Sequence, residues 1–133
     1  MITLTHTPSA TAVELPDALS WVDEYSWSPI EQAKTYTTTG ALLIEEAVRQ
    51  AGRPFTLEGT HDRTWCTRAL VEQLRAWAAT PLIVLDLVLR GNTHSVTFDH
   101  EKGALLGLPV LFYADSAIEA GDFYVPTLRL IGL

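Results

Sequence analysis

Alternation of apolar and polar residues with a period of two runs through much of the chain and predicts strands. At the N-terminus Ile2, Leu4 and His6 alternate with threonines until Pro8 ends the pattern. The segment 11–32 begins as a second short strand. It then mixes prolines, acids and tryptophans without a sustained period, so we expect an irregular arm there.

The stretch Gly40–Gly59 permits two interpretations. As a helix, its apolar stripe ends at Gly52, a residue type that commonly follows the last helical turn. As a strand, it continues the threonine-rich residues before it, whose branched side chains disfavour a helix. Because Pro54 and the alternation after it favour extended backbone, we predict a hairpin over Tyr36–Glu58 that turns near Gln50–Arg53.

The one predicted helix lies within Asp62–Thr80, where Asp62 or Thr64 can cap its N-terminus. Its apolar residues recur at the spacing of a buried helical stripe, and charged residues fall outside that stripe. The members of the stripe are Cys66, Leu70, Leu74, Trp77 and Ala78. One helix that packs against a sheet is therefore expected.

The C-terminal half of the chain reads as strands. After Pro81 comes an apolar run, then the Gly91-Asn92 pair and a second alternating segment, which together predict a hairpin. The segments 104–114 and 122–133 predict two more strands. The fold class expected is mainly β with one helix (α+β), a barrel or sandwich of seven to eight strands packed on the helix, as a single domain over residues 1–133.

Composition narrows the classes of function. The chain has 133 residues, 47% of them hydrophobic, and a formal charge of −7, which argues against a protein that grips phosphate backbones. Cys66 is the only cysteine, so an intrachain disulfide and a cysteine-based zinc site are excluded, and a small core residue is expected. No apolar run approaches the ~20 residues of a membrane span, and we expect no signal peptide.

The titratable side chains do not form a pattern typical of catalysis or metal binding. The histidines lack the spacing of metal-ligand motifs, and adjacent carboxylates on a strand point to opposite faces, so they cannot flank one glycosidic bond. We therefore expect no catalytic residue, no metal, no cofactor and no enzymatic activity. The residues considered are His61, His94, His100, and the pairs Asp23-Glu24 and Glu45-Glu46.

Three aromatic residues of the arm are the candidate interface: Trp21, Tyr25 and Trp27. Aromatic side chains with acidic neighbours anchor protein interfaces, stack on sugars, or simply cover a sheet. As interface anchors, Trp21 and Trp27 could be replaced by alanine with the fold intact and association weakened.

The order of these elements resembles small tail-tip or baseplate proteins of tailed bacteriophages, related in plan to the first domain of distal tail proteins. The phrase "AGRPFTLEG", residues 51–59, is the most specific part of the resemblance. In that family a β-barrel or sandwich with one helix assembles into a ring that continues the tail tube. The resemblance implies a structural role and carries no catalytic residue.

What the resemblance implies about partners is a homo-oligomeric ring, of six copies, that joins the tail tube protein to the baseplate hub. DNA would be passing cargo only, no membrane would be involved, and the protein would be made in the host cytoplasm and reside in the virion tail. An acidic lumen would not retain passing phosphates. Two alternatives remain: a carbohydrate-binding module that uses Trp21, Tyr25 and Trp27, or a small hydrolase with His94 or His100 near a nucleophile.

Overall fold

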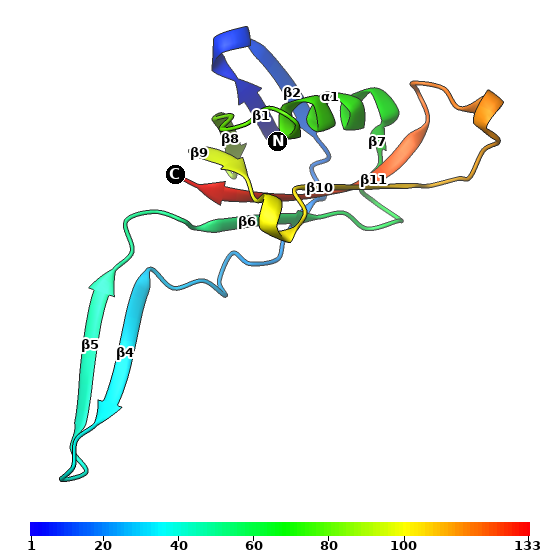
Figure 1. Ribbon diagram of the computed structural model, residues 1–133. Helices are drawn as coiled ribbons and strands as arrows, with labels where there is room; N and C mark the ends of the chain where they lie inside the picture. The colour runs from blue at the N-terminus through cyan, green and yellow to red at the C-terminus, as the bar shows by residue number, and fades with distance from the viewer.

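A computed structural model describes residues 1–133 and shows a large antiparallel sheet, one helix and a separate two-stranded hairpin (Figure 1). The helix, α1, spans Arg68–Ala78, and short 3-10 turns occupy Thr7–Ser9, His100–Lys102 and Asp115–Ala117. The strands are β1 Ile2–His6, β2 Thr11–Leu15, β3 Ser20–Trp21, β4 Ile30–Tyr36, β5 Leu42–Val48, β6 Pro54–Glu58, β7 Cys66–Thr67, β8 Leu85–Leu89, β9 Asn92–Phe98, β10 Leu105–Pro109 and β11 Phe123–Gly132.

The large sheet is open. Its strand order is β2-β1-β8-β9-β11-β6-β3, and β7 and β10 also pair with β11. The end strands β2 and β3 do not pair with each other, so the closed barrel that the sequence suggested is not found. The mainly β class with one helix is confirmed. The eleven strands exceed the predicted seven or eight, partly because β3 and β7 have two residues each, too few for a period to be recognised.

Strand β11 organises the sheet. It pairs with β9 and β10 along one edge and with β6 and β7 along the other. Leu128 and Leu130 point to the same face and are fully buried, whereas Thr127 and Arg129, on the other face, are partly exposed. The core forms on the leucine face. Its members are Ile2, Leu4, Leu15, Leu19, Phe55, Leu57, Leu74, Trp77, Ile83, Leu85, Leu87, Leu89, Val96, Phe98, Ala104, Leu128 and Leu130.

The helix is confirmed but begins later than predicted, at Arg68. Thr67 caps it by accepting a hydrogen bond from the Leu70 amide, so the predicted cap at Asp62 or Thr64 is wrong. Thr64 is instead buried in the preceding loop, where its hydroxyl donates to the Thr60 carbonyl. Cys66 lies in β7, and burial raises the pKa of its thiol to about 11, as expected of a small core residue.

The β8–β9 hairpin is confirmed. Its turn residues are Arg90 and Gly91, with φ of 52° and 79°, one position before the predicted Gly91-Asn92 pair. Two successive positive φ angles match the twist of the flanking strands in a two-residue loop. Asn92 is instead the first residue of β9, opposite Leu89.

The predicted hairpin over Tyr36–Glu58 is wrong, although its extended backbone is right. Strand β5 pairs with the preceding β4, and the turn lies at residues 37–41 rather than 50–53. Strand β6 joins the large sheet between β11 and β3, because Phe55 and Leu57 are buried there at 1% and 0% exposure. The helical alternative for this stretch is excluded.

Gly52 has a φ of +97°, a conformation that costs other residues about 1 kcal/mol or more. We expect Gly52→Val to lower the free energy of unfolding by about that amount. Nothing lies within 4 Å of the added carbon atom, so the backbone strain is the whole of the expected loss. Urea denaturation measures the change. Gly121→Val is the matched control, since Gly121 has open space and no positive φ, and a loss there equal to that at Gly52 would contradict the prediction.

Candidate assembly interface

Strands β4 and β5 form a hairpin that belongs to neither edge of the large sheet. Seven residue pairs join them, from Ile30 opposite Val48 to Tyr36 opposite Leu42. The turn is closed by the Thr37 hydroxyl, which accepts from the Ala41 amide at 3.1 Å, and by Gly40, whose φ is +85°. A threonine-glycine turn between β-branched and aromatic residues explains the local fold.

The hairpin projects from the body of the molecule, as Figure 1 shows at the lower left. Every residue of β4 and β5 is exposed, and the two strands pair only with each other. An isolated two-stranded hairpin is marginally stable in water at best. The hairpin therefore lacks the third strand or covering layer that would normally support it.

One face of the hairpin is largely apolar, and we call it the hairpin face. Directly opposite residues of an antiparallel pair share a face, so the register fixes its membership. Its apolar residues are between 38% and 74% exposed: Ile30, Tyr36, Leu42, Ile44 and Val48. Its polar residues are Gln32, Lys34 and Glu46. The other face holds Glu31, Ala33, Thr35, Leu43, Glu45 and Ala47. Five apolar side chains on one face of a solvated hairpin remain exposed to water, which is unfavourable unless another surface covers them.

Polar contacts hold the arm that precedes the hairpin against the body and join the two chain segments at the open end of the hairpin. Asp23 accepts from the Thr56 amide at 3.0 Å and from its hydroxyl at 2.8 Å. Arg49 forms an ion pair with Glu31, and its amide donates to the Pro29 carbonyl at 2.6 Å. The arm that the sequence predicted as irregular thus has defined anchors on β6 and on the link after β5.

The three candidate interface residues lie in different surroundings. Trp21 stacks on Phe55 with ring centroids 5.0 Å apart, and the Arg53 guanidinium lies 4.7 Å from its ring. Trp27 is half-buried, with the same guanidinium 6.0 Å from its ring. Tyr25 is 90% exposed. Trp21 is therefore attached to the edge of the core, whereas Tyr25 is free to contact another molecule.

Trp21 consequently has a role in stability, which is one of the interpretations that the sequence leaves open. We expect Trp21→Ala to lower the free energy of unfolding by about 2 kcal/mol, because it removes a half-buried ring from Phe55. Tyr25→Ala, the control, should change it by less than about 0.5 kcal/mol. Urea denaturation of both variants measures this. Equal losses would contradict the assignment of Trp21 to the core edge.

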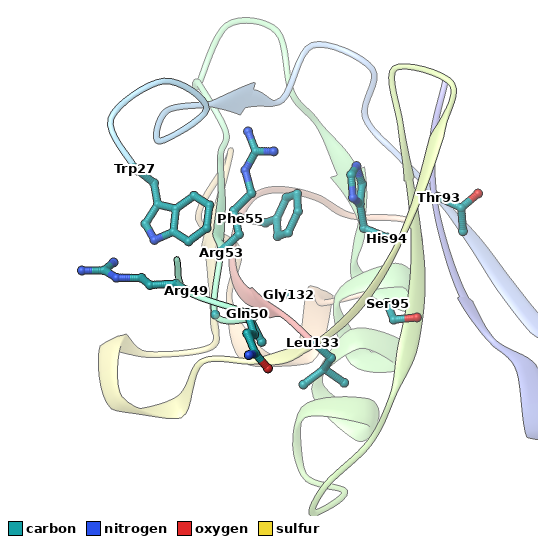
Figure 2. A pocket seen from close by; sticks show the side chains of 12 residues that line it. Trp27, Arg49, Gln50, Arg53, Phe55, Thr93, His94, Ser95, Gly132 and Leu133 are labelled. Carbon is teal, nitrogen blue, oxygen red and sulfur yellow. The ribbon is translucent and has the colours of Figure 1, made fainter. Parts of the chain in front are cut away.

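A cavity of about 370 Å³ opens at the base of the hairpin. Figure 2 shows Phe55 between Trp27 and His94, with Arg53 above them. The pKa of His94 is lowered by burial and, secondarily, by the charge of Arg53. The ring of His94 lies 4.9 Å from that of Phe55, so this histidine, expected at a surface or interface, is partly covered by its own chain.

The other titratable candidates are dispersed. His61 and His100 are exposed, as expected of turn residues. Glu24 pairs with Arg90, and Glu45 and Glu46 lie on opposite faces of β5. No group of three or more His, Cys, Asp or Glu side chains is placed to hold a metal ion.

Sequence reasoning missed the hairpin face. The predicted irregular arm ends at Gln32, and the threonine-rich residues after it are predicted to continue as a strand into Gly40–Gly59, so the turn at residues 37–41 is missed. The signal that could have found it is Gly40 after three threonines, a turn flanked by two β-favouring segments.

Comparison of the chain with protein-family models, with curated proteins and with solved structures gives no match. No helix in the structure has the length and apolar character that crossing a membrane requires.

Proposed function

We propose that this protein is a structural subunit of a phage tail tip or baseplate, whose copies form a ring that continues the tail tube and connects it to the hub. The observation that carries the proposal is the projecting β4–β5 hairpin with its exposed apolar face. Exposed apolar side chains are unfavourable in a monomer, and a neighbouring subunit in an assembly can bury them.

The cost of leaving the hairpin face in water supports an assembly role. Burial of a large aliphatic or aromatic side chain contributes roughly 1.5–3 kcal/mol, and five such side chains are exposed there. Both hairpin strands also have one edge without backbone partners, and unpaired edges are templates for another chain. A neighbouring subunit would bury the apolar side chains of the hairpin face and pair with the free backbone groups at the strand edges.

The negative charge of the chain is compatible with a ring through which DNA passes. At a formal charge of −7, a ring of six copies would present an acidic lumen to passing DNA and would not retain its phosphates. In this proposal the ring stacks between the tail tube protein and the hub proteins. The copy number and these partners rest on the resemblance of the sequence to tail-tip proteins.

The carbohydrate-binding and hydrolase alternatives have less support. A stacking platform needs open aromatic rings, and Phe55 and Arg53 lie against the ring of Trp21. A hydrolase needs a base beside a nucleophile, and the nearest rings to His94 are those of Phe55 and Trp21. Neither alternative explains the hairpin.

Sedimentation velocity of the full chain tests the proposal. The wild-type protein should associate with increasing concentration. A variant in which residues 30–48 are replaced by a short Gly-Ser linker should stay monomeric with the same body fold, because β4 and β5 pair only with each other. Association of the excised variant to the same extent as wild type would overturn the proposal.

A further inference from the structure

The molecule exposes a second apolar surface, away from the hairpin face. We call it the loop patch, and Figure 1 shows the loop between β10 and β11 that contributes to it at the end opposite to the hairpin. The members of the loop patch are between 47% and 91% exposed: Trp65, Leu111, Phe112, Tyr113 and Phe123. Two different apolar surfaces at opposite ends are the arrangement that head-to-tail association requires.

The loop patch contains a preformed cleft. Four of its members, with Val110, line a wholly apolar cleft of about 60 Å³. The Trp65 ring lies 5.6 Å from that of Phe123, and its indole N–H donates to the His61 carbonyl at 2.6 Å, which fixes the orientation of the ring. Phe112 is 91% exposed. The cleft is shaped to receive an apolar side chain, and nothing in the chain itself fills it.

Lys34 on the hairpin face and the acids of the β10–β11 loop are of opposite charge. Lys34 lies on the hairpin face opposite Ile44 and forms no ion pair within the chain. The β10–β11 loop contains Asp115, Glu119 and Asp122 and no lysine or arginine, and none of these acids is in an ion pair. Glu46 and Gln32 share the hairpin face with Lys34, and the Gln32 amide donates to the Glu46 carboxylate. Lys34 is therefore the one group of this face that an acidic rim around an aromatic cleft attracts.

The two surfaces are also of matching size. From the exposed fractions, each offers on the order of 500 Å² of apolar area. A standard interface buries about 800 Å² on each partner, with an apolar centre and a polar rim. The apolar area, with the charged residues around it, is thus sufficient for one stable contact between copies.

We infer that the hairpin face of one copy docks on the loop patch of the next copy, with Lys34 directed at the acidic β10–β11 loop. The inference rests on the proposed function and specifies its subunit contact. Because the contact joins two different surfaces, every copy has one free hairpin face and one free loop patch until the ring closes.

Mixing two defective variants tests this contact. Ile44→Lys spoils only the hairpin face, and Phe112→Lys spoils only the loop patch. Each variant alone should associate at least 30-fold more weakly than wild type. Mixed in equal amounts, they should form dimers and nothing larger, because one intact hairpin face meets one intact loop patch. Leu82→Lys, at a residue 95% exposed and outside both surfaces, is the control and should associate as wild type does.

The outcomes separate the inference from the proposed function. A monomeric wild-type protein would overturn both. Association of wild type and of Phe112→Lys with equal strength would overturn the inference and leave the ring proposal standing. So would a mixture that remains monomeric, since an intact hairpin face and an intact loop patch would then fail to bind each other. Circular dichroism of each variant establishes that loss of association is not loss of fold.

Discussion

Replacement of Ile44 by lysine is expected to weaken self-association by about 30-fold or more, on the order of 2 kcal/mol, without unfolding the chain. Ile44 lies near the middle of the hairpin face and is 48% exposed, so a charge there costs little in the free monomer. In an assembled ring the same charge would have to be buried among apolar side chains, next to Lys34, which adds like-charge repulsion.

The matched control is the neighbouring residue. Leu43→Lys introduces the same charge at a side chain of nearly equal exposure, 49%, on the opposite face of the same strand. Its association should stay within about threefold of wild type, a difference below about 1 kcal/mol. Sedimentation velocity over a concentration series measures both variants. Equal weakening by the two substitutions would show that general charge, and not the hairpin face, controls association.

The second large effect concerns Gly59, where β6 ends. A methyl group added there would lie 2.5 Å from the Pro126 carbonyl oxygen, 2.6 Å from the Thr64 hydroxyl and 2.8 Å from a Val125 methyl group. The Thr64 hydroxyl is itself held by hydrogen bonds to the Thr60 backbone, so it cannot move aside freely. We expect Gly59→Ala to lower the free energy of unfolding by about 3 kcal/mol.

Gly121→Ala is the control for this prediction, because an added carbon atom at Gly121 has nothing within 4 Å. Urea denaturation of the two variants should therefore give midpoints that differ clearly, with Gly121→Ala close to wild type. A Gly59→Ala protein as stable as wild type would mean that β6 and β11 can separate at this point without cost.

Much of the large sheet could be predicted from sequence because its strands have one buried face. In β1 and β9, the apolar positions alternate along the chain as burial alternates in the fold, and β8 lies in the apolar run before β9. The helix could be predicted for the same reason, from an apolar stripe of which Leu74 and Trp77 are buried. The periodicity of apolar residues predicts an element correctly where the apolar residues are the ones that the core buries.

The candidate site could not be predicted so well, because its residues do not pack in the core. The hairpin strands are exposed on both faces, so burial leaves no regular pattern in them. Both Gly40 and Gly52 have positive φ. The prediction places the turn near Gly52 because Pro54 and the alternation after it favour extended backbone, although Gly40 follows three threonines. The stacking of Trp21 on Phe55 depends on β3 pairing with β6, a non-local contact that no short motif encodes.

If this chain is a ring subunit, the mass of the protein under native conditions will show it. Native mass spectrometry of the concentrated full chain should give one closed species at six times the 14.7 kDa of the chain, with few intermediate species because a closed ring satisfies every contact. A chain that remains at 14.7 kDa at every concentration would contradict the account.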